Sequence, residues 1–169
     1  MTTRCPDCGA PTDSLGRHLP PPQPDGFTQP SISTDACCIR TTSRGPEVLL
    51  IVRGHWPGQG LLAFPGGFCD YGEDPERSVL RELAEETGIE GRSPRLLLAH
   101  GAPDRDPRKH VITLLYHVEV DALSAPEGGD DAASADWYPL NQVLPEPDRF
   151  AFDHHDMLVE ALLALGIGV

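Results

Sequence analysis

Three glutamates, Glu82, Glu85 and Glu86, lie close together in the segment GGFCDYGEDPERSVLRELAEETGIE. On a helix these positions are i, i+3 and i+4, so the three carboxylates project from one face within a single turn and repel one another. A hard divalent cation such as Mg2+ reverses that repulsion, because it takes oxygen ligands and pairs a few carboxylates with phosphate oxygens and water. Arg81, four residues before Glu85, can neutralise and orient part of the cluster. The pattern therefore predicts a cation site for a phosphate compound, with a solvated acidic helix face as the alternative.

The helix that carries these glutamates is predicted from about Pro75 to Thr87. Asp74 is a suitable N-cap in front of the proline, and Gly88 offers a C-cap. Apolar residues recur at helical spacing between the two ends. Ahead of the helix, Gly66 and Gly67 predict a loop whose backbone can come close to metal or phosphate.

Most of the remaining elements are predicted to be strands. We expect strands at ISTDACCIR, EVLLIVRG and LLAF before the acidic helix and at RLLLAHGAP and HVITLLYHVEV after it, with a brief strand or bend at DWYPL. The segment APEGGDDAASA is expected to be a loop, and a closing helix is predicted from Phe152 to Leu165. This order of elements favours an α+β sandwich over a doubly wound sheet.

Length and charge restrict the function classes. The chain has 169 residues, enough for one globular domain, and a formal net charge of -13. Such a charge argues against sequence-independent binding to nucleic acid or to an anionic membrane surface, and a phosphate ligand would need a mediating cation. No apolar run approaches the roughly 20 residues of a membrane span, and the N-terminus lacks a signal-peptide pattern. We expect a soluble, cytoplasmic protein with no nucleic-acid or membrane partner.

Residues 1–30 are predicted to be a mobile or extended proline-rich arm, and the folded domain is expected over residues 31–169. The five cysteines are an odd number at irregular spacing, which suits a reducing compartment better than a disulfide framework. Cys5 and Cys8 in the arm have the spacing of half a zinc knuckle. A structural zinc site takes four ligands and no second C-x-x-C follows, so an unliganded turn is favoured over zinc.

Positions around the acidic helix match, without a departure, the pattern G-x5-E-x7-R-E-U-x-E-E-x-G-U, in which U is aliphatic. They are Gly67, Glu73, Arg81, Glu82, Leu83, Glu85, Glu86, Gly88 and Ile89. The sequence therefore resembles the Nudix hydrolase family, whose signature this is, over about residues 31–165. The resemblance implies a Nudix-type α/β/α sandwich with a mixed β-sheet between helices. It also implies Mg2+ or Mn2+ as cofactor and hydrolysis of a nucleoside diphosphate linked to another moiety.

Roles for the residues of this motif also follow from the resemblance. The implied metal ligands are the Gly67 carbonyl and the side chains of Glu82, Glu85 and Glu86. Arg81 and Glu73 would brace the loop and the helix. The implied reaction is attack of water on a phosphorus atom of the pyrophosphate, where metal ions neutralise developing charge and lower the pKa of the water.

One carboxylate must accept the proton of the attacking water. Members of the family differ in whether this base is a glutamate of the helix or an acidic residue of a later loop. The later candidates here are Asp130 and Asp131 in GGDDAASADW, with Glu127 behind them, although acidic residues beside glycine are also ordinary turn composition. We favour Glu85 or Glu82 over Asp131.

Three further stretches look like the ADP-ribose pyrophosphatase branch of the family: PGGFCDYGE, DRDPRKHVITLLYHV, and GDDAASADWYPL followed by FAFDHHDML. They favour ADP-ribose as the small-molecule substrate, with AMP and ribose 5-phosphate as products. The predicted substrate-binding residues are Arg53, Arg108, Gly66 and Gly67, with Arg105 and Lys109 as further cations for a diphosphate or a terminal ribose or as part of a solvated loop. Aromatic candidates for stacking on an adenine are Phe64, Tyr71 and Trp137, although such positions are more often core. His55 and Trp56 either form a rim of the cleft or turn the chain.

Other functions stay open at this stage. NADH and nucleoside triphosphates are alternative substrates of the same chemistry, and a non-catalytic Nudix-like nucleotide sensor is an alternative of another class. Regulators of that sort usually show an eroded motif or an appended DNA-binding helix pair, and the sequence shows neither. The complete carboxylate set therefore favours an enzyme. A homodimer is expected from the resemblance to the ADP-ribose branch.

Overall fold

The computed structural model of the chain describes residues 3–4, 11–12, 29–129 and 132–168. Near the N-terminus it contains a short antiparallel pair, β1 (Thr3–Arg4) with β2 (Pro11–Thr12). Cys5 and Cys8 lie outside the described residues, as does Asp131. A strand starts at Ser31, where the sequence predicts that the folded domain begins.

The first sheet contains four strands in the order β7-β3-β9-β8. They are β3 (Ser31–Cys37), β7 (Gly66–Phe68), β8 (Arg92–His100) and β9 (Val111–Glu119). β3 runs parallel to β9, with Ser31 opposite Val111, whereas β7 and β8 pair antiparallel with their neighbours. The sheet is therefore mixed, as the resemblance implies.

The second sheet is antiparallel and has the order β10-β5-β4, with β6 also paired to β5. Its strands are β4 (Ile39–Thr42), β5 (Gly45–Arg53), β6 (Leu62–Ala63) and β10 (Ala132–Pro139). β5 is buried on both faces, because Val48 and Leu50 belong to one core cluster and Leu49 belongs to the other. This explains why the strand reads as a continuous apolar run rather than an alternating one.

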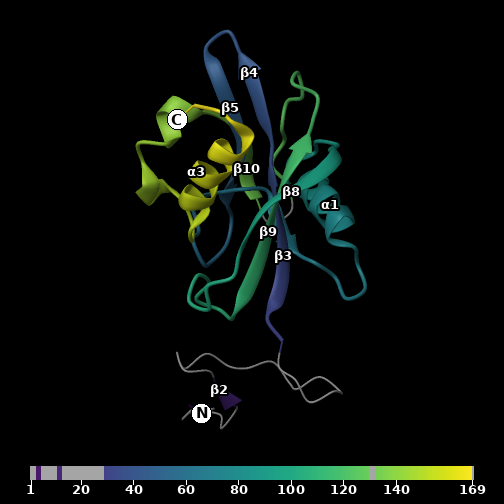
Figure 1. The fold of residues 1–169 in the computed structure, drawn as a ribbon, viewed down its shortest axis with the longest axis vertical. Coiled ribbons are helices and arrows are strands. Elements are labelled where there is room, and N and C mark those ends of the chain that lie inside the picture. The colour runs from purple at the N-terminus through teal and green to yellow at the C-terminus, as the bar shows by residue number, and fades with distance from the viewer. Residues whose placement is uncertain (1–2, 5–10, 13–28, 130–131, 169) are drawn as a thin grey trace.

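The two long helices, α1 (Pro75–Thr87) and α3 (His154–Leu165), lie on opposite sides of the strands (Figure 1). α1 buries Val79 and Leu83 in one core cluster, and α3 buries Met157 and Leu158 in the other. The short helices α2 (Leu140–Val143) and η1 (Pro147–Arg149) connect β10 to α3. This arrangement confirms the predicted α+β sandwich. No helix in the described ranges is long and apolar enough to cross a membrane.

The predicted bounds and caps of α1 are confirmed. The Asp74 side chain accepts a hydrogen bond of 2.9 Å from the Glu76 backbone N–H. Gly88 adopts a φ of 68°, which glycine reaches without the penalty of a Cβ, and its N–H bonds to the Ala84 carbonyl. Both ends of the helix that carries the glutamates are therefore fixed by local sequence.

The prediction of one continuous strand at residues 32–40 is wrong. The strand is interrupted at Cys38, because β3 pairs within the first sheet and β4 pairs with β5 in the second sheet. The loop predicted at Gly66 is also wrong, since Gly66–Phe68 forms β7 and pairs with β3. A Cβ built on Gly66 would lie 2.2 Å from the Thr34 carbonyl oxygen, so only glycine allows this close approach.

Two other boundaries differ from the prediction. α3 begins at His154 rather than Phe152, because Phe152 has a φ of 54° and cannot belong to a right-handed helix. β10 begins at Ala132 rather than near Asp136, because the end of the predicted loop pairs with β5. Small residues such as those of AASA give no strong strand signal, and pairing decides their conformation.

Candidate active site

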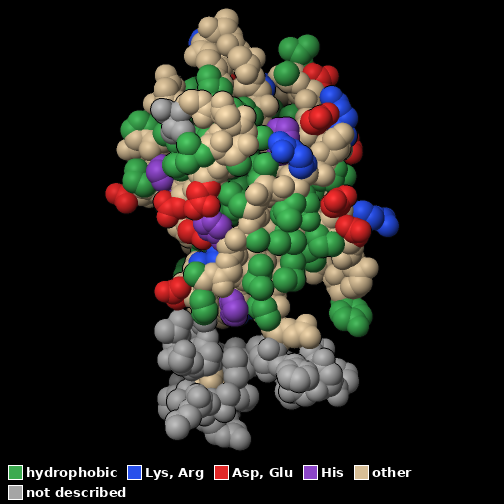
Figure 2. Space-filling model, viewed as in Figure 1, with side chains coloured by type: hydrophobic (Ala, Val, Ile, Leu, Met, Phe, Trp, Pro, Cys, Tyr) green, Lys and Arg blue, Asp and Glu red, His purple; other side chains and the backbone are tan. Residues whose placement is uncertain are grey.

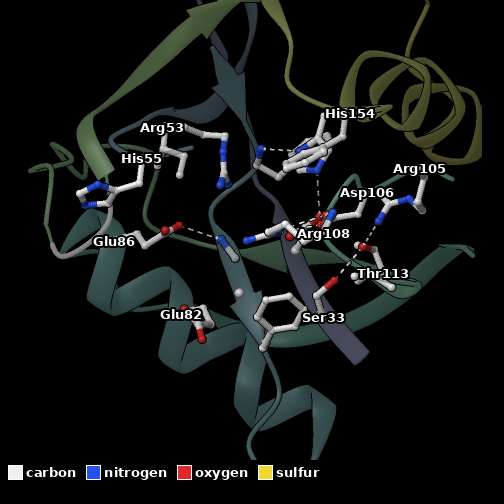
Figure 3. Close-up of a pocket in the computed structure, with 18 of the residues that line it drawn as sticks. Ser33, Arg53, His55, Glu82, Glu86, Arg105, Asp106, Arg108, Thr113 and His154 are labelled. Atoms are coloured by element: carbon white, nitrogen blue, oxygen red, sulfur yellow. Dashed lines mark hydrogen bonds and ion pairs between the residues drawn. The ribbon is translucent and has the colours of Figure 1, made fainter. Parts of the chain in front are cut away.

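A cavity of about 410 Å3 lies between α1, both sheets and the N-terminal end of α3. Its lining comes from β3, β5, β7, β9 and α1 and from the segments between them, where the lining residues are His55, Trp56, Phe64, Arg105, Asp106, Arg108 and Phe152, together with His154 at the start of α3. In Figure 3, Glu82 and Glu86 extend from α1 on one side of the cavity, and Arg53 and Arg108 lie on the other. The cavity therefore joins a carboxylate wall to a cationic wall.

Arg81 holds the carboxylate wall together. Its Nε and one terminal nitrogen donate to the two Glu73 oxygens, both at 2.9 Å, while the other terminal nitrogen donates to Glu82 at 2.7 Å and to Glu85 at 2.9 Å. These hydrogen bonds lower the pKa of Glu73 to about 2 and raise the pKa of Arg81. Burial raises the pKa of Glu82. Arg81 thus offsets the repulsion between carboxylates that the sequence pattern creates.

Glu86 points into the molecule and is 5% exposed. Its Oε2 accepts a hydrogen bond of 2.8 Å from the Gly66 N–H, which fixes the side chain against β7. Burial raises the pKa of Glu86 to about 8, because a charge in this position has lost most of its hydration. A positive charge placed beside this carboxyl would favour its ionised form.

The residues of the α1 and β7 walls fit a hard divalent cation. All the predicted side-chain ligands are carboxylates on one helical face, and a Cβ on Gly67 would lie 2.6 Å from the Glu82 carboxyl group. Glycine at this position therefore keeps open the space next to Glu82. In the described ranges no three His, Cys, Asp or Glu side chains surround one common point. The reason is that Arg81 draws Glu82 and Glu85 toward itself, while Glu86 bonds to the Gly66 N–H.

The cationic wall contains the predicted substrate-binding residues Arg53 and Arg108. Arg53 donates from Nε to the Pro57 carbonyl at 2.8 Å, and Arg108 forms an ion pair of 2.7 Å with Asp106. Both guanidinium groups lie near the ring of Phe152, at 5.0 and 5.9 Å from its centroid. Burial and the nearby Arg108 charge lower the pKa of Arg53. Two like charges held this close are suited to an anion that contacts both.

Between these walls lies a buried polar layer that the sequence did not predict. Asp35 on β3 is 6% exposed, and burial raises its pKa to about 7. His154 accepts a hydrogen bond of 3.1 Å from the Phe64 N–H at Nδ1, so its neutral ring carries the proton on Nε2, 3.5 Å from Asp35 Oδ2. Burial and the charge of Arg105 lower the pKa of His154 to about 3. The neutral imidazole thus faces a carboxyl oxygen that, among the described residues, has no hydrogen-bond partner.

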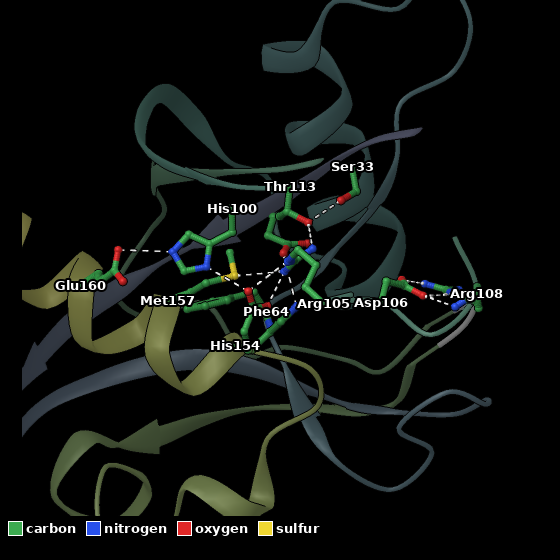
Figure 4. Close-up of polar contacts among 12 residues, drawn as sticks. Ser33, Phe64, His100, Arg105, Asp106, Arg108, Thr113, His154, Met157 and Glu160 are labelled. Carbon is green, nitrogen blue, oxygen red and sulfur yellow. Dashed lines mark hydrogen bonds and ion pairs between the residues drawn. The ribbon is translucent and has the colours of Figure 1, made fainter. Parts of the chain in front are cut away.

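Arg105 belongs to this polar layer rather than to a solvated loop. Its side chain is 5% exposed and bonds to both oxygens of Asp153 and to Thr113, which in turn bonds to Ser33 at 2.7 Å (Figure 4). Burial would raise the pKa of Asp153, but hydrogen bonds from Arg105 and His100 lower it to about 2. Arg105 is therefore both paired and buried, whereas the side chain of Arg108, although paired with Asp106, is 32% exposed. We exclude Arg105 from the residues that are available to bind an anion.

The structure brings most of the predicted site residues to this one cavity: Gly66, Gly67, Arg81, Glu82, Glu85, Glu86, Arg53 and Arg108. His55 and Trp56 also line it, which supports the rim interpretation. Of the predicted stacking residues, Phe64 lines the cavity but is only 1% exposed, whereas Tyr71 and Trp137 do not line it. Asp35 was missed, and a charged residue inside the strand segment ISTDAC was the one available signal.

The profile of the NUDIX domain matches residues 32–160 of the sequence. The chain belongs to the Nudix family. Among its relatives, the ADP-ribose pyrophosphatase of Methanocaldococcus jannaschii is 36% identical over 132 residues, which are 78% of this chain and 73% of that protein. The ADPR-responsive transcriptional repressor NtrR of Acinetobacter baylyi is 29% identical over 145 residues, which are 85% of this chain but 57% of the repressor.

Two solved Nudix structures are similar over most of this chain. The NUDIX domain of Shewanella oneidensis NrtR in complex with ADP-ribose superposes with a TM-score of 0.76 and 31% sequence identity. The superposition covers 85% of this chain and 93% of the NrtR chain. The bifunctional NMN adenylyltransferase/ADP-ribose pyrophosphatase of Francisella tularensis, with AMP and an Mn ion, has a TM-score of 0.68 and 28% identity. This superposition covers 81% of this chain and 42% of the bifunctional protein's chain.

Proposed function

We propose that this Nudix chain hydrolyses the diphosphate of ADP-ribose with Mg2+ or Mn2+, giving AMP and ribose 5-phosphate. The observation that carries the proposal is the cavity itself, in which the carboxylates of α1 stand opposite Arg53 and Arg108. A diphosphate bridged by a cation on one side and contacted by guanidinium groups on the other fits both walls. The relative named as an ADP-ribose pyrophosphatase and the similar structure with ADP-ribose support this substrate class.

The residues that we propose as metal ligands are the Gly67 carbonyl and the side chains of Glu82, Glu85 and Glu86. When bound, the metal supplies positive charge near the reacting phosphorus and lowers the pKa of the attacking water. Arg81 contributes by keeping Glu82 and Glu85 oriented while the cation is absent. Arg53 and Arg108 bind the diphosphate, and the Pro57 carbonyl and Asp106 hold them in place for it.

Two glutamates are the proposed proton acceptors for the attacking water. Glu85 is the more accessible, with 45% of its side chain exposed, whereas burial raises the pKa of Glu82 and so favours its role as a proton acceptor. Asp131, outside the described residues, is the third candidate. The pH dependence of kcat/KM in Glu82→Gln and Glu85→Gln distinguishes them, since loss of the acidic limb identifies the base.

The test of the proposed function is a product assay. Purified protein with Mg2+ or Mn2+ is incubated in turn with ADP-ribose, NADH, other sugar nucleotides and nucleoside triphosphates, and the products are separated by chromatography. We expect preferential conversion of ADP-ribose to AMP and ribose 5-phosphate. Preference for another compound would be compatible with the proposed metal site but would refute ADP-ribose as the preferred substrate.

A second candidate function is an ADP-ribose sensor. It is favoured by two similarities. One is to NtrR, which is named an ADPR-responsive transcriptional repressor, and the other is to the NUDIX domain of NrtR, whose structure was solved in complex with ADP-ribose. The same incubation distinguishes the two, because a sensor binds ADP-ribose in a thermal-shift assay without releasing AMP. We place the enzyme first, because the carboxylates and Gly67 fit a metal.

Two further properties belong to this proposal. The free cysteines Cys37, Cys38 and Cys69 are consistent with the cytoplasm, a reducing compartment. A homodimer is consistent with the hydrophobic side chains that gather over β8 and β9 in Figure 2, where Leu96 is 51% exposed. Light scattering after size exclusion tests the dimer, and a mass of 18.3 kDa would refute it.

A further inference from the structure

Trp56 is unusual among the aromatic residues of the cavity, because it lines the cavity and is 70% exposed. Phe64 is buried, and the rings of Phe68 and Phe152 already have cationic side chains at 4.0 to 5.9 Å from their centroids. Among the described residues, the indole of Trp56 has no such ring or cation contact. An exposed indole in a polar cavity leaves a large flat apolar face in water, which a planar ligand can cover.

The segment that carries Trp56 is held firmly at its base. Pro57 is buried, and its carbonyl accepts the hydrogen bond of 2.8 Å from Arg53. A Cβ on Gly58 would lie 2.9 Å from the Ala151 side chain, so the backbone packs tightly there. The Gly60 N–H bonds to the Arg53 carbonyl at 2.9 Å, which closes the turn. The exposure of Trp56 is therefore set by a fixed turn.

The position of Trp56 relative to the charged groups indicates which part of a ligand it meets. It lies three residues after Arg53, whose guanidinium group belongs to the cationic wall for the diphosphate. The neighbouring His55 lies on the Glu86 side of the cavity in Figure 3, away from the buried layer around Arg105. A ligand with its diphosphate between the two walls thus places one of its ends next to Trp56. A nucleobase is the end whose flat aromatic face matches an indole.

We propose that Trp56 is the stacking platform for the nucleobase of the substrate, and thereby a residue that determines preference for nucleotide over base-free ligands. This inference rests on the proposed function for its choice of ligand. The indole stacks on the base while Arg53 and Arg108 bind the diphosphate. Stacking of a base on an aromatic side chain accounts for roughly a tenfold or greater gain in affinity.

The first test uses intrinsic fluorescence, because the chain has two tryptophans and they differ in exposure. Trp137 is 7% exposed and donates to the Ser124 carbonyl at 3.1 Å, so ligand in the cavity does not reach it. We expect AMP to quench the fluorescence of the wild type and ribose 5-phosphate to leave it unchanged. In Trp56→Phe the quenching by AMP should disappear. Equal quenching by AMP in Trp56→Phe and the wild type would overturn the proposal.

The second test is kinetic and uses ADP-ribose. Trp56→Ala should raise KM about tenfold or more and change kcat less than threefold, whereas Trp56→Phe should recover most of the affinity because it keeps an aromatic face. Tyr71→Ala is the matched control, since Tyr71 is fully exposed and does not line the cavity. A KM of Trp56→Ala within twofold of the wild type contradicts the stacking role. If the wild type does not hydrolyse ADP-ribose, the proposed function fails, while the AMP titration still decides the role of Trp56.

Discussion

Glu86→Gln should make the metal-free protein more stable while abolishing its metal-dependent activity. Glu86 is buried, and its pKa rises from 4.5 to about 8 in the folded protein. A carboxyl whose pKa is raised by folding binds more protons in the folded state, so stability falls as the pH rises from the unfolded pKa to the folded one. Glutamine resembles the protonated carboxyl and lacks this penalty, and it can still accept the Gly66 hydrogen bond.

The magnitude follows from the same shift. Ionisation of Glu86 lowers the free energy of unfolding. At pH 7 this loss is limited to about 3 kcal/mol by the difference between the pH and the unfolded pKa, and at pH 9 the full pKa shift corresponds to about 5 kcal/mol. At pH 4.5 the variant and the wild type should differ by less than about 0.5 kcal/mol. The predicted gain in stability therefore appears only above the unfolded pKa and is complete once the pH exceeds about 8.

Urea denaturation with a chelator at pH 4.5, 7 and 9 measures this difference. Adding Mg2+ at about 100 times its Kd should stabilise the wild type by about 2.7 kcal/mol and the variant far less. Turnover should fall more than 100-fold in the variant. Glu90→Gln, at an exposed position just beyond α1, is the control and should match the wild type throughout. A stability difference that stays flat from pH 4.5 to 9 would refute the burial argument, and turnover within tenfold of the wild type would refute the metal role.

Three other variants test the elements around the site. Gly67→Ala should weaken Mn2+ binding at least tenfold in a calorimetric titration, with stability changed by less than about 1 kcal/mol, because the added Cβ meets the movable end of the Glu82 side chain. Asp74→Ala should lower the free energy of unfolding by about 1 kcal/mol in urea, because it removes the N-cap hydrogen bond of α1. Asp153→Asn should cost about 2 kcal/mol at neutral pH, because the folded pKa of Asp153, about 2, lies below the ordinary aspartate value of 3.8. The difference should vanish in urea titrations as the pH falls from about 4 through 2, since Arg105 then loses its charged partner in the wild type as well.

The sequence predicted α1 well because its determinants are local. Asp74 and Gly88 fix its ends, and the spacing of the glutamates is a property of one helix. The same local pattern predicted carboxylates and a glycine that all line one cavity. The cationic wall was predictable in part, because Arg53 is the last residue of a strongly apolar strand.

The buried polar layer could not be predicted, because its members come from distant parts of the chain. Asp35 and His154 are separated by more than one hundred residues and meet only when β3 and the start of α3 pack together. The sequence placed Arg105 in a loop, where a solvated cation was one interpretation. In the structure its side chain is buried and forms an ion pair with Asp153. Burying a charged residue within a strand costs free energy unless a partner compensates for the charge. A charged residue in a strand that is expected to be buried therefore predicts a polar partner from elsewhere in the chain.

The parallel pairing of β3 with β9 has a consequence for how the protein is made. Residues on these strands that pair, such as Ser33 and Thr113, are 80 positions apart, so β3 leaves the ribosome long before its parallel neighbour exists. α1 is complete at Thr87, but the first sheet against which it packs is complete only when Glu119 has emerged. At ordinary synthesis rates the intervening residues take about 2 to 6 s. During that interval the apolar side of the acidic helix lacks part of its cover, and transiently exposed apolar surface of this kind is prone to aggregate.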